Sequence, residues 1–258
     1  MYLSASRSKK VNEYFSLAGF YDRIMDETDY DAWADYIVSL SERSGVAVKT
    51  ILDLACGTGV ITCRLAAKGY ELIGVDISPE MLMEANARAG EGDYAVAPMF
   101  INQNLRELDM YGTSDAAICS FDGFNYIAPE ELGDVFRRVS YFVEPGGIFI
   151  FDVNTEAKFR KMDGMTYIDE ADDFFCAWRT DYYEEERECV YCVDVFRREG
   201  ELWERTSEEH VEYTHDLPHL KELLLENGFE DVSFFGELSF DAPESDADRV
   251  FVCCRRKL

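Results

Sequence analysis

A buried strand that runs into a glycine turn constrains the fold of this chain more than any other segment. Residues 51–59 read Ile-Leu-Asp-Leu-Ala-Cys-Gly-Thr-Gly, and Asp76 ends the next apolar run, 17 residues after Gly59. This order is typical of proteins that bind a nucleoside-bearing cofactor: a strand, a glycine turn, a helix, and a second strand with a carboxylate at its tip. The segment therefore predicts two parallel strands joined by a helix.

Strand and helix patterns continue to alternate over about a hundred residues. Continuous apolar runs are typical of parallel strands covered on both faces, so the alternation predicts a doubly wound α/β sheet. The expected strands are 50–55, 71–76, 100–103, 116–121 and 148–151. The expected helices are 59–68, one that Ser78 caps with Pro79 at its first position, and one opened by Pro129; Gly146-Gly147 is expected to end that section.

The chain begins with aromatic-rich helices in residues 11–45 and changes its pattern again after Asn154. In the first part, residues 33, 36, 37 and 40 form an amphipathic stripe, with Asp31 as the expected N-cap and Gly45 as the stop. Residues 165–213 carry β patterns instead, at 174–183, 188–196 and 201–213, with a hairpin turn at 198–201. A helix at 218–225 and strands at 232–238 and 249–254 then resume the α/β pattern.

The charge and the cysteines exclude several classes of function. A net charge of −27, spread along the chain, disfavours extended contact with nucleic acid and with anionic membranes. The eight cysteines follow no disulfide framework, and the single pair Cys189 and Cys192 lacks a second pair at zinc spacing, so we expect free thiols in a reducing compartment and no metal. With no apolar leader or long apolar run, the expected location is cytoplasmic.

The histidines do not form a metal motif either. They stand at 210, 215 and 219, and Pro218 places the start of a helix between the last two, so their spacing is not that of a helical metal pair. His210 is instead a candidate general base.

The glycine turn does not match the dinucleotide fingerprint. Counted from Gly57 and Gly59, the third glycine position holds Thr62, and the turn has no P-loop lysine. A nicotinamide-dependent oxidoreductase is therefore disfavoured. A carboxylate at Asp76 still suits the two hydroxyls of a ribose.

Residues 51–59 together with 75–78 closely resemble the first two motifs of the class I S-adenosylmethionine-dependent methyltransferases. Residues 100–108 resemble the third motif, whose acidic residue reads the adenine amino group; here that position holds Asn104, whose amide oxygen can still accept a hydrogen bond. Residues 115–126 resemble the fourth motif and 146–152 the fifth strand. The aromatic N-terminal segment and the β-rich insertion resemble a bacterial subgroup of the small-molecule type.

The resemblance implies a mostly parallel seven-stranded sheet in the Rossmann-like methyltransferase fold. It divides the chain into a helical N-terminal lid (1–45), a cofactor-binding α/β domain (46–158 and 214–258) and an antiparallel β insertion (159–213). The expected cofactor is S-adenosylmethionine, with S-adenosylhomocysteine as its product. The expected cofactor-binding residues are Tyr14, Asp53, Ala55, Cys56, Gly57, Thr58, Gly59, Asp76, Ile77, Met81, Asn104, Leu105 and Ser120.

The expected reaction is in-line transfer of the sulfonium methyl group to an N or O nucleophile. Orientation and exclusion of water would supply most of the acceleration. The expected catalytic residues are Tyr21, Asp122, Asn125 and His210. The lid and the insertion would enclose a small-molecule acceptor, in a monomer or homodimer; a protein acceptor and a non-catalytic sensor remain the alternatives.

Overall fold

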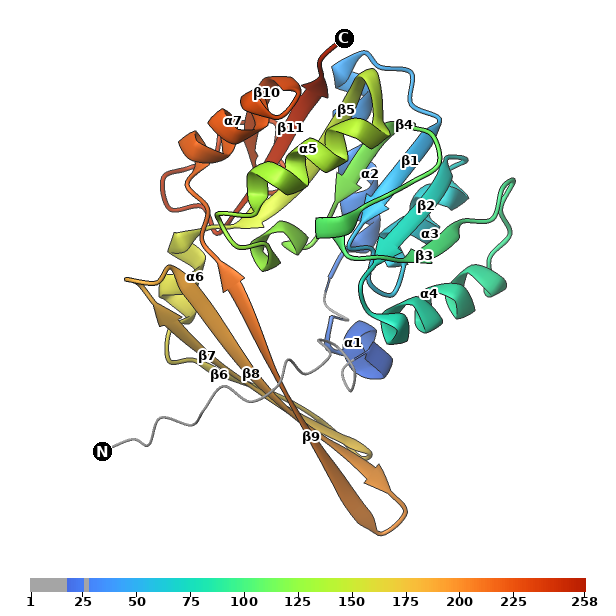
Figure 1. Cartoon of the computed structure of the whole chain (residues 1–258). Coiled ribbons are helices and arrows are strands. Elements are labelled where there is room, and N and C mark those ends of the chain that lie inside the picture. The colour runs from blue at the N-terminus through green and yellow to red at the C-terminus, as the bar shows by residue number, and fades with distance from the viewer. Residues whose placement is uncertain (1–17, 26–27) are drawn as a thin grey trace.

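The structure, a computed structural model, describes residues 18–25 and 28–258 (Figure 1). Its helices and strands alternate through the first part of the chain, and four consecutive strands precede the last helix. The elements are α1 (Ala18–Ile24), α2 (Tyr30–Ser44), β1 (Thr50–Leu54), α3 (Val60–Ala67), β2 (Glu71–Asp76), α4 (Pro79–Glu91), β3 (Met99–Asn102), η1 (Leu105–Glu107), β4 (Ser114–Cys119), η2 (Gly123–Tyr126), α5 (Leu132–Phe142), β5 (Val143–Asn154), α6 (Glu156–Met162), β6 (Thr166–Ala171), β7 (Phe174–Tyr183), β8 (Glu188–Glu199), β9 (Leu202–Tyr213), α7 (Leu217–Glu226), β10 (Phe229–Gly236) and β11 (Arg249–Arg256).

The central sheet has seven strands in the order β10-β11-β5-β4-β1-β2-β3. The five strands from β3 to β5 are parallel, whereas β11 and β10 are antiparallel to their neighbours. The chain reverses its direction of travel across the sheet between β1 and β4, and ligands bind beyond the carboxyl ends of such strands. The predicted mostly parallel, seven-stranded sheet is confirmed.

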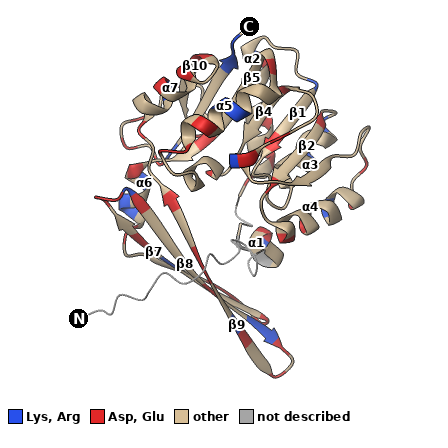
Figure 2. Ribbon diagram, viewed as in Figure 1, with Lys and Arg blue, Asp and Glu red and all other residues tan. Residues whose placement is uncertain are grey.

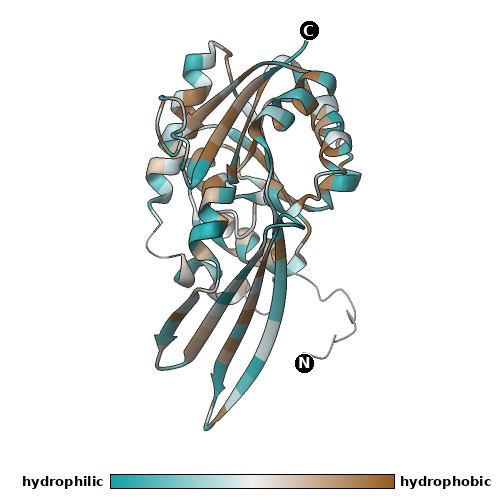
Figure 3. Cartoon of the chain, turned by 90° about the vertical axis from the view of Figure 1, so that its left-hand side faces the viewer, coloured by the Kyte–Doolittle hydropathy of each residue, from teal (hydrophilic) through white to brown (hydrophobic). Residues whose placement is uncertain are grey.

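Helices cover both faces of this sheet, and the apolar strands lie between them (Figure 3). On one face α5 and α7 pack on β4, β5 and β11 through a phenylalanine cluster that includes Phe136 and Phe149. On the other face α2 and α3 pack through the predicted stripe of α2, in which Trp33 and Ile37 are buried. Burial on both faces explains why these strands read as uninterrupted apolar runs.

The second sheet is antiparallel, in the order β6-β7-β8-β9, and extends away from the α/β domain below α1 and α6 (Figure 1). The predicted hairpin turn lies between β8 and β9, where Gly200 has a φ of 65°. One face of this sheet is buried. On that face, alternate residues of β8 from Cys189 to Val195 pack in one cluster with Phe159 of α6.

The helix ends mostly follow the predicted caps. Ser78 accepts a hydrogen bond from the Met81 amide at the start of α4, and Gly45 ends α2 with a φ of 74°. The N-cap of α2 is Asp29 rather than Asp31, because the Asp29 side chain accepts from the Ala32 amide and Asp31 lies in the first turn.

Two further predictions about elements were wrong. The pair Gly146-Gly147 lies within β5, where a Cβ on Gly147 would meet the Asp115 carbonyl oxygen at 2.5 Å, and the register of β4 and β5 shifts nearby. These glycines therefore accommodate a β-bulge and a close contact between strands inside β5. They do not end the segment that precedes the strand. Pro129 precedes α5, which begins at Leu132.

The sequence analysis also missed α6 and β6. The apolar content of α6 is one buried residue, Phe159, and β6 is an exposed edge strand, so neither carries a periodic pattern that is long enough to read.

Acidic side chains are distributed over both sheets and their helices, as expected from the sequence (Figure 2). Within the described part of the chain, no helix is long and apolar enough to cross a membrane.

Candidate active site

The glycine turn between β1 and α3 adopts a left-handed backbone at three positions, Ala55, Gly57 and Gly59, with φ values of 53°, 53° and 71°. A Cβ on Gly59 would stand 2.9 Å from both Ala85 and Phe100, so this position excludes any larger residue. No atom of residues 18–25 and 28–258 would lie within 4 Å of a Cβ on Gly57, so among these residues the turn borders open space there. The turn thus packs tightly on one side and leaves room for a ligand on the other.

Asp76 at the tip of β2 holds the turn. Its Oδ2 accepts from the Gly57 amide and its Oδ1 from the Ser78 amide, both at 2.8 Å. Each carboxylate oxygen has a second lone pair, so these bonds leave acceptor capacity. The glycine turn and Asp76 are thus joined by a direct hydrogen bond from the Gly57 amide to the carboxylate.

Asp53 lies beneath the turn, not at its surface. Its side chain is buried and accepts a 2.5 Å hydrogen bond from the Thr62 hydroxyl of α3. Burial raises the pKa of Asp53 to about 7, with nearby Asp76 acting in the same direction and the Thr62 bond opposing it. Asp53 is placed to support the turn from below.

This raised pKa predicts how stability depends on pH. The unfolded state releases the Asp53 proton near pH 4 and the folded state near 7, so stability falls as pH rises between these values. We expect Asp53→Asn to remove this loss of stability, because the amide does not ionise. Above pH 7 the variant should therefore be more stable than the parent by a few kcal/mol, on the order of 1.4 kcal/mol for each unit of difference between the folded and unfolded pKa. Urea unfolding of the variant and the parent at pH 5 and pH 8 measures this difference in the free energy of unfolding.

The exposed carboxylate Asp134 supplies the control for this measurement. Asp134→Asn should shift the free energy of unfolding equally at both pH values. An Asp53→Asn variant whose stability relative to the parent is the same at pH 5 and pH 8 would contradict the raised pKa.

The other predicted cofactor residues surround the same edge of the sheet, with different exposure. Ile77 is half exposed, whereas Met81 and Leu105 are buried. Cys56 lies in the turn, and burial raises the pKa of its thiol well above the usual range, which opposes a nucleophilic role. Asn104 caps η1, where its side-chain oxygen accepts from the Arg106 amide at 3.0 Å. Tyr14 lies outside the described residues.

A second turn, after β4, lies against the glycine turn. A Cβ on Gly123 would stand 3.0 Å from the Ala55 Cβ. Two consecutive residues of this turn, Phe121 and Asp122, have φ values of 59° and 58°, which is uncommon for residues other than glycine. The predicted residue Ser120 immediately precedes them and is partly buried.

A carboxylate that the sequence analysis missed holds this strained turn. The fully buried Asp152 of β5 accepts from the Phe121 amide at 2.8 Å and the Asp122 amide at 3.0 Å. Arg249 of β11 donates to Asp152 and, at 3.3 Å, to Asp122. Burial raises the pKa of Asp152, and Arg249 opposes that rise. This ion pair fixes where the Asp122 carboxylate points.

Asn154 at the end of β5 joins Asp122 to the insertion sheet. Its Nδ2 donates to Asp122 Oδ2 at 2.6 Å and to Glu212 Oε2 of β9 at 3.0 Å. The two carboxylates therefore share one amide. Lys158 of α6 donates to Asn154 Oδ1 at 2.8 Å and completes the network.

Asn125 does not fit the predicted contact with substrate. It is fully buried, its Nδ2 donates to the Asn154 and Tyr213 carbonyls, and its Oδ1 accepts from the Asn154 amide. All of these bonds are to main chain, so Asn125 ties β5 to the end of β9. We reassign it from catalysis to positioning.

His210 and Tyr21 flank the network. His210 is buried, with Nε2 3.2 Å from Glu208 Oε2 and its ring edge-on to Tyr126. Tyr21 of α1 packs on the buried face of the insertion sheet. Burial raises the pKa of the Tyr21 phenol, and Asp122 is the largest electrostatic contribution to the rise, so this phenol stays protonated near neutral pH.

Helix α1 connects the glycine turn to the insertion sheet. Asp22 accepts from the Thr58 hydroxyl at 2.6 Å and pairs with Arg88 of α4. On the next residue, Arg23 pairs with Asp173 at 3.2 Å and lies over the Phe174 ring. One short helix thus contacts both parts of the site.

We expect Asp22→Ala to raise the Kd for S-adenosylmethionine severalfold. The variant loses the bond to Thr58 and the pair with Arg88, and partial exposure limits the effect to about 1 kcal/mol or less. Calorimetric titration measures it. Asp35→Ala is the matched control, because Asp35 pairs with Lys68 on the outer surface of α2 and α3; equal affinities of the two variants would contradict a role for α1 at the turn.

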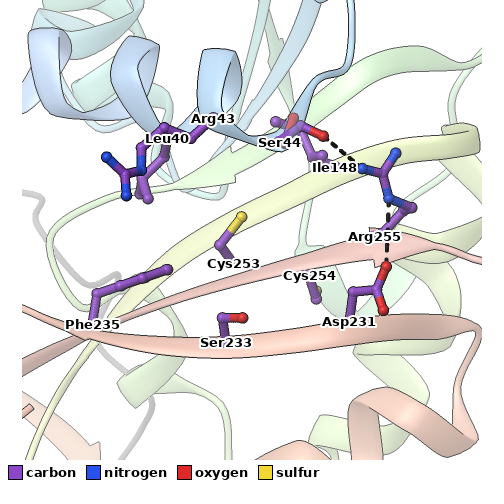
Figure 4. A pocket seen from close by; sticks show the side chains of 10 residues that line it. All are labelled: Leu40, Arg43, Ser44, Ile148, Asp231, Ser233, Phe235, Cys253, Cys254 and Arg255. Atoms are coloured by element: carbon purple, nitrogen blue, oxygen red, sulfur yellow. Dashed lines mark hydrogen bonds and ion pairs between the residues drawn. The ribbon is translucent and has the colours of Figure 1, made fainter. Parts of the chain in front are cut away.

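A cavity of about 240 Å³ lies elsewhere, between α2 and the strands β5, β10 and β11 (Figure 4). At its rim, Arg255 donates to the Ser44 carbonyl at 2.7 Å and pairs with Asp231. None of the predicted site residues that the structure describes lines this cavity.

Comparisons with known proteins agree on one class. The methyltransferase domain family matches residues 51–147. The putative methyltransferase YqeM of Bacillus subtilis (strain 168) is 30% identical over 242 residues, which are 92% of this chain and 95% of that protein. A glycine/sarcosine N-methyltransferase of Halorhodospira halochloris is 25% identical over 244 residues, 90% of this chain and 85% of that protein. The crystal structure of an S-adenosylmethionine-dependent methyltransferase from Clostridium acetobutylicum ATCC 824 has a TM-score of 0.83 at 27% identity and covers 95% of this chain and 99% of its own.

Proposed function

The chain belongs to the class I S-adenosylmethionine-dependent methyltransferases, and from this premise we propose that it methylates an N or O nucleophile of a small-molecule acceptor. The acceptor would bind between the turn after β4 and the insertion sheet. The observation that carries the proposal is the contact of the two turns, in which Gly123 lies against Ala55. It brings the cofactor turn and the Asp122 network to one edge of the sheet.

The residues of the first turn fit the cofactor. The open space beside Gly57 suits a ligand that approaches the main chain, and Asp76 retains acceptor capacity for ribose hydroxyls. Ile77 is half exposed next to it and would contact the adenine. Asn104 would accept from the adenine amino group through its second lone pair. When bound, the cofactor supplies an electrophilic methyl group on a sulfonium.

The chain's own contribution would be orientation and exclusion of water. Asp122 is fixed by Arg249 and Asn154 and would orient the acceptor. The lid helix α1 contacts both the glycine turn and the insertion sheet and would close over the bound molecules. The relative from Halorhodospira halochloris is named for N-methylation of two small amino acids, which supports an acceptor of this size.

Release of S-adenosylhomocysteine tests the proposal. The purified chain is incubated with S-adenosylmethionine and a panel of small amines, alcohols and carboxylic acids, with a mixed peptide library as a separate arm. Methylation of a small molecule is expected. Methylation confined to peptides, with S-adenosylmethionine bound in calorimetry, contradicts the small-molecule acceptor.

A further inference from the structure

We propose that the acceptor is an aliphatic amine, and that Glu212 on the buried face of the insertion sheet binds its ammonium group and takes its proton. This inference rests on the proposed function and names the substrate class of the same site. Three independent features of the insertion sheet support it.

The first feature is a row of ionisable residues on the buried face of β9. Glu208, His210 and Glu212 alternate along the strand and are 6%, 1% and 3% exposed. Successive residues of a strand point to opposite faces, so these three side chains share one face. The residues between them point to the other face, where Glu209 is exposed. A buried face that only supported the fold would carry apolar residues here, as the adjacent strand does at Val193 and Val195.

The second feature is a buried hydroxyl with no partner. Thr180 of β7 pairs in register with Tyr191 of β8, which pairs with His210 of β9. Directly opposite residues share a face about 5 Å apart, so the three side chains form one row across the sheet. Thr180 is 1% exposed, and its Oγ1 has no hydrogen-bond partner among residues 18–25 and 28–258. A buried hydroxyl without a hydrogen-bond partner lowers the stability of the fold. We therefore infer that a bound molecule supplies a partner for the Thr180 hydroxyl.

The third feature is an unbalanced charge. The network joined by Asn154 holds three buried or largely buried carboxylates, of Asp122, Asp152 and Glu212. Among residues 18–25 and 28–258, two cations bond to this network, Arg249 and Lys158. Arg249 pairs with Asp152 and Asp122, whereas Lys158 donates to the Asn154 oxygen. An ammonium group bound beside Glu212 would favour the charged form of its carboxyl group and balance the charge of these described groups.

The surroundings of Glu212 suit both binding and proton removal. Burial and the adjacent Asp122 raise its pKa, while the Asn154 bond, Lys158 and Arg249 oppose the rise. Tyr191 and Tyr21 pack in one cluster on the same buried face of the insertion sheet. Burial, together with Glu212 and Asp122, raises the pKa of each phenol. Aromatic faces attract an alkylammonium by cation–π interaction. An alcohol would leave the extra carboxylate without a counter-charge.

The ammonium form of the amine gives one proton to the Glu212 carboxylate, and the nitrogen lone pair becomes free. That lone pair forms a bond to the methyl carbon as the carbon–sulfur bond breaks, and the bonding electrons go to sulfur, which becomes the neutral thioether of S-adenosylhomocysteine. The product is the N-methylammonium, and the proton on Glu212 leaves to solvent.

A kinetic comparison of Glu212→Gln with Glu209→Gln tests this role. The panel consists of primary and secondary aliphatic amines, each paired with the alcohol of the same carbon skeleton. The parent should methylate amines and not their alcohols. Glu212→Gln keeps an oxygen for the Asn154 amide but loses the charge and the base, so kcat/KM should fall about 100-fold or more, with the Kd for S-adenosylmethionine unchanged. Glu209→Gln, on the exposed face of the same strand, should match the parent.

Thr180→Val gives a second readout that does not depend on the charge. Removing an unpartnered hydroxyl should leave Tm unchanged or raise it, yet raise KM for the amine. A lower Tm with unchanged KM would mean that Thr180 only supports the fold.

The outcomes separate the two proposals. Turnover of the alcohols in place of the amines, or full amine turnover by Glu212→Gln, overturns the amine assignment and leaves the small-molecule function standing. Binding of S-adenosylmethionine with no methylation of any panel member contradicts the proposed function, and this inference with it.

Discussion

Asp76→Ala is expected to weaken the binding of S-adenosylmethionine by about 1–3 kcal/mol, roughly 5- to 150-fold in Kd. The carboxylate accepts the amides of Gly57 and Ser78, so its loss leaves both donors without their acceptor and frees the glycine turn. It also removes the charged acceptor that we assign to the ribose. Isothermal titration calorimetry with S-adenosylmethionine measures the change.

Asp76→Asn separates the two contributions. The amide oxygen retains one acceptor for the turn, but the charge and the second acceptor are lost, so its affinity should lie between those of the parent and Asp76→Ala. Far-ultraviolet circular dichroism checks that each variant is folded. A folded Asp76→Ala variant with the parent's Kd for S-adenosylmethionine would contradict the assignment of Asp76 to cofactor binding.

Arg249→Leu is expected to destabilise the fold by about 3–5 kcal/mol. Asp152 is fully buried and would lose its ion-pair partner while its carboxylate still accepts the Phe121 and Asp122 amides. The guanidinium also lies over the Trp33 ring of α2, so its removal also loses a contact between β11 and α2. Equilibrium urea unfolding gives the change in free energy.

The control is Arg197→Leu in the insertion sheet. Arg197 makes exposed ion pairs with Glu199 and Glu204, whose loss should change stability by about 0.5 kcal/mol or less. The double variant Arg249→Leu with Asp152→Leu should recover part of the lost stability, because it removes the uncompensated buried charge. An Arg249→Leu variant as stable as the parent would show that Asp152 is neutral in the fold.

Local patterns in the sequence were sufficient to predict the glycine turn after β1 and the carboxylate at the end of β2. The turn from Asp53 to Gly59 and the carboxylate of Asp76 lie within 25 residues, and each is marked by a residue type that the local conformation requires. Gly59 is necessary because Ala85 and Phe100 leave no space for a Cβ. The strands of the central sheet were equally legible, since burial on both faces makes them continuously apolar.

The hydrogen-bonded network around Asp122 was predicted less well. His210 and Asp122 were singled out, but Glu212, Asn154, Asp152 and Arg249 were not. Each is a polar residue in a strand, and a single strand pattern does not show which face meets a polar neighbour. Asn125 was assigned to catalysis from its place after β4, although its bonds to the Asn154 and Tyr213 main chain give it a positioning role.

The sequence by itself therefore determined the fold class and the methyl donor, because periodicity, turn glycines and a strand-end carboxylate are local signals. Only the tertiary structure decided how the network around Asp122 and Asn154 is built. Asp122 meets Arg249 across 127 positions of the chain, and Asn154 meets Glu212 across 58. Such contacts depend on how two sheets are placed, and no pattern of neighbouring residues records that placement.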